Sequence, residues 1–206
     1  RGDMDRDSQA ATIFNAWTRQ LKRKLLADEL ESYWNKRGES SYLGGVANGI
    51  DLDSLGDMLV EGRGSWCDDA VSTERIETCD EVLNTSLDEA LRELRKIDRD
   101  PSMKSWAWGD FLETHYRHQP FSEVNVLRTV FGRRIGNGGS PDSINVASFG
   151  LEKSRGYTQE FGAGFRQLVA LSPDRIEHLY MNSTGQSGNV VSAHYDDMIV
   201  PFRNVE

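Results

Sequence analysis

The segment Ala163–Asn182, AGFRQLVALSPDRIEHLYMN, decides the fold class. Apolar and polar residues alternate within Ala163–Leu171 and again within Ile176–Asn182, and a period of two residues is typical of β-strands. Between the two strands lies Ser172-Pro173-Asp174-Arg175, a group of turn-forming residues. The segment therefore predicts an antiparallel β-hairpin.

The residues before the hairpin predict one more strand. The stretch Gly136-Asn137-Gly138-Gly139-Ser140-Pro141 has the composition of a turn, and the alternating segment Ser143–Phe149 follows it. Three strands from so short a stretch form only a thin sheet. We therefore expect strands from elsewhere to complete it.

The N-terminal part of the chain has the period of helices instead. Ser8 is a suitable N-cap, and apolar residues recur in steps of three or four over residues 10–30. A short helix capped by Asp53 is predicted next. A third helix is predicted from Thr73 to Ile97, and Asp100-Pro101 is expected to stop it.

Helices first and strands last is the order of an α+β fold. We expect residues 1–130 to form a mainly helical segment and residues 131–206 a segment of antiparallel strands, together one fragment of a larger domain. The chain begins at Arg1 with no apolar stretch typical of a signal peptide, and it ends without a polar tail. These features indicate a piece of a longer protein.

Composition excludes some classes of partner. The chain has 206 residues, with 24 Lys and Arg against 33 Asp and Glu, which gives a formal net charge of −9. Nucleic acids and anionic membranes are bound by clustered basic charge, so this balance argues against both. No apolar run of ~18 residues occurs, and no membrane span is predicted.

The two cysteines, Cys67 and Cys79, are twelve positions apart. A zinc site would need more ligands, and the nearest histidine, His115, lies 36 residues further on. Two interpretations stay open on the residues alone. The pair forms a disulfide, which would indicate an oxidising compartment, or it is two inert buried thiols.

The histidines are His115, His118, His178 and His194. On a helix, His115 and His118 would share a face, but two histidines alone do not hold a catalytic metal, and the HExxH spacing is missing. We expect all four to be structural residues that form hydrogen bonds.

Two glycine-rich stretches and one acidic pair lack the spacing of known catalytic motifs. No Lys-Ser/Thr follows Gly136–Gly139, and the spacing GxGxxG is absent, so no phosphate cradle is predicted there. The stretch Gly185-Gln186-Ser187-Gly188 does not fit GxSxG, and we expect it to turn the backbone. On a strand the side chains of Asp196 and Asp197 would point apart. The residues alone therefore predict no catalytic, metal or cofactor site.

Several stretches, in their order and spacing over nearly the whole chain, resemble the C-terminal part of the β chain in the penicillin acylase family of N-terminal-nucleophile hydrolases. They are Met4–Ala11 leading into Phe14 and Trp17, Trp66–Asp69 with Glu77–Cys79, Trp106–Asp110, His118–Phe121, Ser143–Ala147, Gly162–Arg166, Ser183–Gly188 and Ser192–Asp197. One departure is Val190-Val191-Ser192-Ala193, where the family typically has a Pro-rich segment.

The resemblance implies a fold, a reaction and a location. The fold would be an αββα sandwich, to which this chain contributes wrapping helices and C-terminal strands. The parent would be a periplasmic or secreted amidohydrolase that cleaves N-acylated small molecules such as β-lactam side chains or acyl-homoserine lactones. The nucleophile would be the N-terminal Ser of the mature β chain, with its own α-amino group as the base. The resemblance also favours the Cys67–Cys79 disulfide.

The resemblance places the catalytic machinery elsewhere. Because this chain begins with Arg1, the nucleophile is expected outside it, and so are the oxyanion hole and the structural calcium that the family often binds. The pairs Gly64-Ser65 and Gly139-Ser140 lie too deep in the chain to be expected cleavage sites. The partners would be the α chain and the N-terminal part of the β chain. The alternative is a non-catalytic structural or interaction module.

Overall fold

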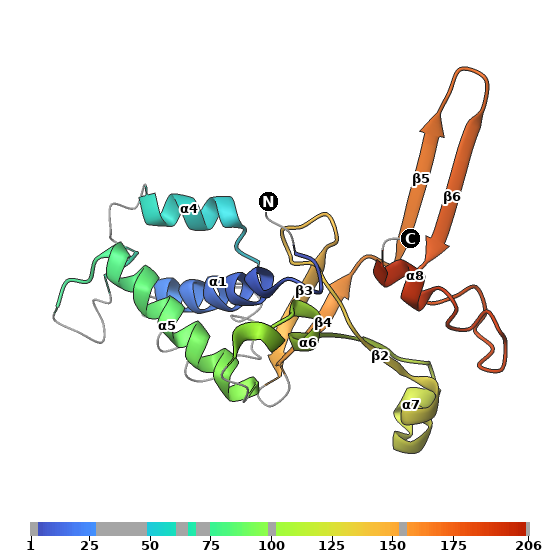
Figure 1. The fold of residues 1–206 in the computed structure, drawn as a ribbon, viewed down its shortest axis with the longest axis horizontal. Coiled ribbons are helices and arrows are strands. Elements are labelled where there is room, and N and C mark those ends of the chain that lie inside the picture. The colour runs from blue at the N-terminus through green and yellow to red at the C-terminus, as the bar shows by residue number, and fades with distance from the viewer. Residues whose placement is uncertain are drawn as a thin grey trace.

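The computed structural model of the chain describes residues 4–27, 49–60, 66–68, 75–98, 102–152 and 156–204. Helices α1 (Gln9–Ala27), α4 (Leu52–Val60) and α5 (Cys79–Ile97) lie at one end, a small sheet lies in the middle, and a hairpin projects at the other end (Figure 1). Short helices connect these parts: η1 (Met103–Ser105), α6 (Trp108–Phe111), η2 (Phe121–Glu123), α7 (Asn125–Phe131) and α8 (Ile199–Asn204).

The starts of the helices follow from their caps. The hydroxyl of Ser8 accepts a hydrogen bond from the Ala11 amide at 3.2 Å, as predicted. Helix α5 begins at Cys79 because Thr78 and Glu81 form a capping box. The predicted cap Asp53 is wrong: the Asp51 carboxylate accepts from the Ser54 amide at 2.7 Å, so α4 begins earlier.

Several sequence predictions lie outside the described residues. They are the end of the first helix at Leu30, the pair Gly64-Ser65 and the stop at Asp100-Pro101. The helix predicted from Thr73 starts too early, because residues 75–78 are not helical and Thr78 caps a helix that begins at Cys79.

The central sheet is mixed, with strand order β2-β1-β4-β3. Its strands are β1 (Leu112–Tyr116), β2 (Arg133–Gly136), β3 (Ala147–Glu152) and β4 (Gly156–Gly162). Strands β1 and β4 are parallel and the other pairs antiparallel, so the expectation of purely antiparallel pairing is corrected. Strand β1 lies within the segment that was predicted to be mainly helical.

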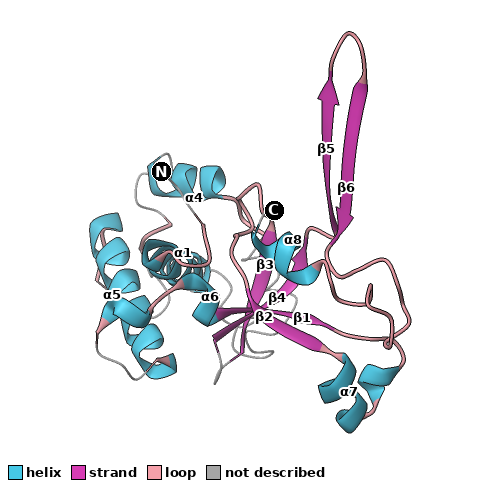
Figure 2. Cartoon of the chain, turned by 45° about the vertical axis from the view of Figure 1, so that its right-hand side comes forward, coloured by secondary structure: helices cyan, strands magenta, loops and turns pink. Residues whose placement is uncertain are grey.

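The predicted strand Ser143–Phe149 starts too early. Residues before Ala147 form a turn in which the Ser143 hydroxyl accepts from the Ser140 amide at 2.8 Å, and β3 then continues to Glu152. The predicted hairpin is confirmed as β5 (Phe165–Leu171) and β6 (Ile176–Asn182), with Ala163 and Gly164 outside the strand. In the part of the chain described, this hairpin forms its own two-stranded sheet, apart from β3 (Figure 2).

Aromatic residues join the helices to the central sheet. Trp106 and Trp108 are fully buried, and the Trp108 ring packs 5.3 Å from Phe149 and 5.4 Å from Tyr157, centroid to centroid. The Trp17 indole N–H donates to the Leu83 carbonyl and to the hydroxyl of Ser86, which ties α1 to α5. These side chains surround the same core as Ala90, Leu94, Phe111 and Leu112. None of the helices in the described ranges is long and apolar enough to cross a membrane.

Candidate functional site

The two cysteines form a disulfide, which confirms the pairing that the resemblance favours. Cys67 and Cys79 lie with their Cα atoms 5.1 Å apart, and the bond ties residues 66–68 to the first residue of α5. The side chain of Cys67 is buried beside Leu25 and Val82. The alternative of two free buried thiols is therefore wrong.

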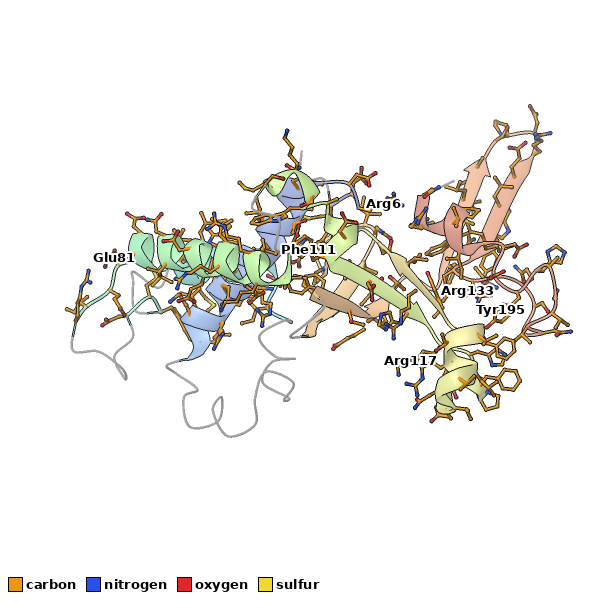
Figure 3. The ribbon with its side chains drawn as sticks, turned by 60° about the horizontal axis from the view of Figure 1, so that its bottom comes forward. Arg6, Glu81, Phe111, Arg117, Arg133 and Tyr195 are labelled. Carbon is orange, nitrogen blue, oxygen red and sulfur yellow. A yellow bond between two sulfur atoms is a disulfide. The ribbon has the colours of Figure 1, made fainter. Side chains whose placement is uncertain are left out.

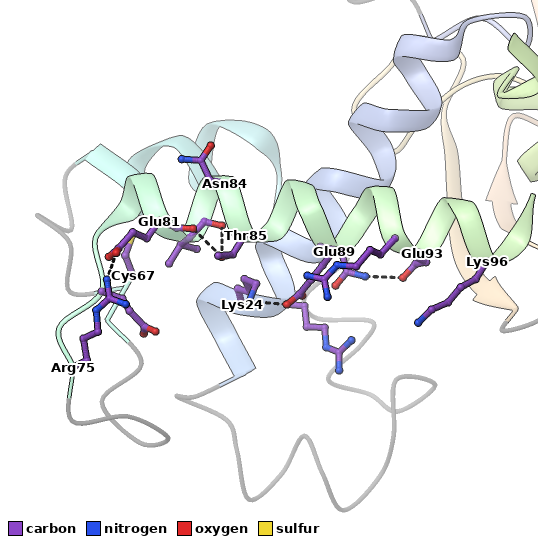
Figure 4. Close-up of a pocket in the computed structure, with 14 residues that line it drawn as sticks. Lys24, Cys67, Arg75, Glu81, Asn84, Thr85, Glu89, Glu93 and Lys96 are labelled. Carbon is purple, nitrogen blue, oxygen red and sulfur yellow. Dashed lines mark hydrogen bonds and ion pairs between the residues drawn. The ribbon is translucent and has the colours of Figure 1, made fainter. Parts of the chain in front are cut away.

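Charged side chains cover one face of α1 and α5, where a cavity of about 790 Å³ lies (Figure 4). The Lys24 ammonium pairs with Glu89 at 3.0 Å. The Arg19 guanidinium pairs with Glu93 at 2.9 Å, and Arg75 pairs with Glu81. Two of these ion pairs, Arg19–Glu93 and Lys24–Glu89, connect α1 to α5.

The glycine-rich stretch Gly136–Gly139 binds protein backbone. The Gly139 amide donates to the Met4 carbonyl at 2.7 Å, and the Gly109 amide donates to the Arg6 carbonyl at 2.6 Å. We call Met4–Ser8 the strap, and Gly109, Gly138 and Gly139 the glycine slot that holds it. The Trp108 indole N–H donates to the Gly139 carbonyl at 2.8 Å, which anchors the slot to the buried core.

A buried amide network supports the slot. Asn137, only 7% exposed, donates from Nδ2 to the Thr114 hydroxyl at 3.0 Å and to the Gln159 side-chain oxygen at 3.1 Å. Thr114 also donates to Gln159, and the Asn137 oxygen accepts from the Gly138 amide at 2.9 Å. Sequence reasoning missed Thr114 and Gln159, because they join Asn137 only once β1 and β4 are paired.

A second cavity, of about 360 Å³, lies between the end of β1 and the C-terminal loop (Figure 3). Arg133 donates to the Asp196 carboxylate at 2.7 Å and lies 5.6 Å from the ring centroid of Tyr195. The Tyr195 hydroxyl donates to the Phe131 carbonyl at 2.6 Å. Burial raises the pKa of Tyr116 in the wall of this cavity, with partial opposition from Arg166.

The histidines near these features contact groups of the fold itself. His115 pairs with Glu113 at 2.9 Å, and its place on β1 corrects the idea that it shares a helix face with His118. The ring of His118 stacks on Phe121 at 4.7 Å, and its Nε2 lies 3.3 Å from the Gly188 carbonyl oxygen. His194 pairs with Asp197 at 2.9 Å.

These contacts bear on the candidate chemistry. The three ring contacts run to carboxylates and a carbonyl, and none runs to a hydroxyl that a histidine could activate. Asp196 and Asp197 lie in a turn rather than on the strand that was expected, and their carboxylates have separate partners, Arg133 and His194. In the Gly185–Gly188 turn, the Ser187 hydroxyl accepts from the Asn189 amide at 3.1 Å.

The comparison with family models is decisive at this point, because the penicillin amidase model matches residues 1–206. The chain belongs to the penicillin amidase family. A search of curated proteins finds no match. The family is one of N-terminal-nucleophile hydrolases whose precursors are processed into chains, and its members are typically exported.

The two glycine-rich stretches, Gly136–Gly139 and Gly185–Gly188, lie in or beside segments that resemble the penicillin amidase family. The motifs on which the resemblance depends form both the glycine slot with its strap and the cavity beside the C-terminal loop. Met4–Ala11 and Trp106–Asp110 contribute the strap and part of its slot, while His118–Phe121 and Ser183–Gly188 line or border the C-terminal cavity. In this penicillin amidase chain these motifs hold backbone segments together, and the α+β architecture is the one expected.

Proposed function

We propose that the protein containing this chain hydrolyses the amide bond of N-acylated small molecules, such as β-lactam side chains or acyl-homoserine lactones. The observation that carries the proposal is the penicillin amidase match across all 206 residues. The nucleophile would be an N-terminal Ser outside this chain, with its α-amino group as the base. A Ser-bound acyl intermediate would then be released by water.

The proposal gives the described residues a supporting role. The histidines at positions 115, 118 and 194 are occupied by Glu113, Gly188 and Asp197, which is consistent with a nucleophile located elsewhere. No group of three or more His, Cys, Asp or Glu side chains within the described ranges is arranged to hold a metal ion. We propose that the ligands of the structural calcium that the family often binds lie outside this chain.

The projecting hairpin supports the proposal that the rest of the precursor is the partner. By the β5–β6 register, Phe165, Val169 and Tyr180 lie on one face and Leu168 with Leu179 on the other. Each of these side chains is between 47% and 70% exposed. A sheet that is apolar on both faces is typical of an interior layer covered on both sides. Other segments of the same precursor would supply that cover.

Location is also part of the proposal. A disulfide persists in oxidising compartments, and the Cys67–Cys79 bond therefore supports a periplasmic or secreted enzyme. Cell fractionation of the full-length protein, with free-thiol measurement on each fraction, would test this assignment.

The activity test uses the full-length precursor, obtained by extending the gene upstream. The processed protein should release the acyl group from a chromogenic N-acyl substrate, and replacing the mature N-terminal Ser with Ala should abolish turnover. The isolated 206-residue chain should give only the buffer rate. Turnover by the isolated chain that a mutation within it abolishes would contradict the proposal.

Sedimentation of the isolated chain over a hundredfold dilution range tests the partner. An exposed apolar hairpin should cause self-association, since its unpaired edges and faces favour pairing. A strictly monomeric chain at every concentration would instead support a non-catalytic interaction module.

A further inference from the structure

The strap passes between two chain segments that approach it through glycines. A Cβ atom added at Gly138 would lie 2.8 Å from the Met4 carbonyl oxygen and 2.9 Å from the Arg6 nitrogen. A Cβ atom at Gly109 would lie 3.0 Å from the Arg6 Cβ. The strap therefore fits between these glycines with no room for a side chain on either.

The slot itself is rigidly held. Gly139 has φ +99, a backbone conformation that favours glycine, and a Cβ there would lie 2.1 Å from the Asn145 carbonyl oxygen. Asn137 and Trp108 fix the same loop through buried hydrogen bonds. The position of the strap is thus set by backbone contacts on two sides, and any chain that precedes Met4 is connected through it.

We propose that the strap and the glycine slot fix the position of the preceding catalytic part relative to this chain, so that Gly138 and Gly109 are positioning residues for the amidase reaction. This inference rests on the proposed function, which places the nucleophile before residue 1. A displacement of the strap would move the chain that leads to the nucleophile. The positioning role would also explain the glycine-rich stretch Gly136–Gly139, which does not fit a phosphate-binding motif.

The first test is Gly138→Ala in the full-length enzyme. To bring the new Cβ from 2.8 Å to an ordinary contact of 3.4 Å, the strap must move by about 0.6 Å (3.4 − 2.8). Misplacement by ~1 Å can cost about a hundredfold in rate, so we expect kcat per titrated active site to fall about tenfold with KM within about twofold. The matched control is Gly56→Ala, where an added Cβ meets no atom within 4 Å, and kcat should stay unchanged.

The second test decides the matter if Gly138→Ala fails to fold. Gly109→Ala should lower kcat per active site, and adding Arg6→Gly should restore much of it, because the clashing Arg6 Cβ is then gone. Arg6→Gly alone is the reference for the double variant, so that the loss caused by Gly109→Ala is compared with and without the Arg6 Cβ. A merely structural slot would lower the yield of active sites and leave the kcat of each unchanged.

Two failures are distinguishable. If the wild-type full-length protein turns over none of the N-acyl substrates, the proposed function fails and the positioning role fails with it. If the wild type is active and Gly138→Ala keeps kcat within twofold per active site, or Arg6→Gly gives no recovery in Gly109→Ala, only the positioning role is overturned.

Discussion

Replacing Glu93 with Ala should destabilise the helical end of the protein by about 3 kcal/mol. The Glu93 carboxylate accepts from Arg19 at 2.9 Å, from the Gln20 amide at 2.6 Å and from the Tyr157 hydroxyl at 2.8 Å. It therefore connects α1, α5 and β4 through one side chain. The Glu93 and Arg19 side chains are 18% and 14% exposed, so solvent screens the pair only weakly.

The magnitude follows from what the substitution leaves behind. Tyr157 is only 1% exposed and loses its hydrogen bond to the Glu93 carboxylate, and a hydrogen bond to a charged group contributes ~1.5–3 kcal/mol. Breaking a fully buried ion pair costs ~3–5 kcal/mol, which must be reduced here because some exposure remains. These effects overlap, and a total of about 3 kcal/mol is reasonable. Glu93→Gln keeps the shape and one acceptor, and we expect about half that loss.

Glu89→Ala is the matched control, because Glu89 lies one turn earlier on α5 and pairs with Lys24 at 3.0 Å. The Glu89 side chain is 37% exposed, and exposed pairs contribute less than ~1 kcal/mol. In urea denaturation with a slope of ~2 kcal/mol/M, Glu93→Ala should lower the midpoint by about 1.5 M and Glu89→Ala by less than about 0.5 M. Equal shifts in the two variants would refute the argument from burial.

Three further outcomes are expected. Gly136→Ala should cost at least ~2 kcal/mol of folding stability, because the new Cβ would lie 2.1 Å from the Gly109 carbonyl oxygen. Gly56→Ala, in an open part of α4, should instead stabilise the protein by ~0.5–1 kcal/mol. Similar denaturation midpoints for the two variants would contradict this expectation. The pKa of Glu81 lies below the ordinary 4.5, chiefly because its carboxylate accepts a hydrogen bond from the Thr78 backbone amide. Desolvation opposes this shift, and the positive charge of Arg75 adds to it. The capping box therefore contributes its full stability above pH about 4.5 and loses it as the pH falls through the lowered pKa. Hydrogen exchange of the first backbone amides of α5 should accordingly become faster in acid. Glu81→Gln should remove that pH dependence. Thiol titration of the unreduced, denatured protein should find no free thiol, and two per chain would disprove the disulfide.

The elements that the sequence predicts well are those set by neighbours along the chain. The hairpin β5–β6 needs only an alternating pattern and a four-residue turn, and Ile176–Asn182 matches β6 in full. Helix α5 has the predicted apolar period and ends at Ile97 as predicted, whereas the capping box that starts it at Cys79 was not recognised. In each case the information lies within a few residues of where it acts.

The elements that were missed depend on distant partners. Strand β1 has only five residues, and it becomes a strand by pairing with β2 and with β4, more than forty positions further on. The Asn137 network needs Thr114 and Gln159 to meet across that same sheet. The slot is harder still to predict, because glycines about thirty positions apart in sequence act only by allowing the strap to lie between them.

The two ends of the chain differ in how they are stabilised. The helical end has a capping box, a disulfide and the Glu93 hydrogen bonds, all of which are satisfied by residues described here. The β5–β6 hairpin has two strands and exposes Leu168, Leu171 and Ile176 by 70% or more, and an isolated two-stranded hairpin is at best marginally stable in water. Its stability must then come from whatever covers it. On the proposed function the cover is the remainder of the precursor, so docking of the hairpin and positioning of the nucleophile through the strap would both depend on the same assembly.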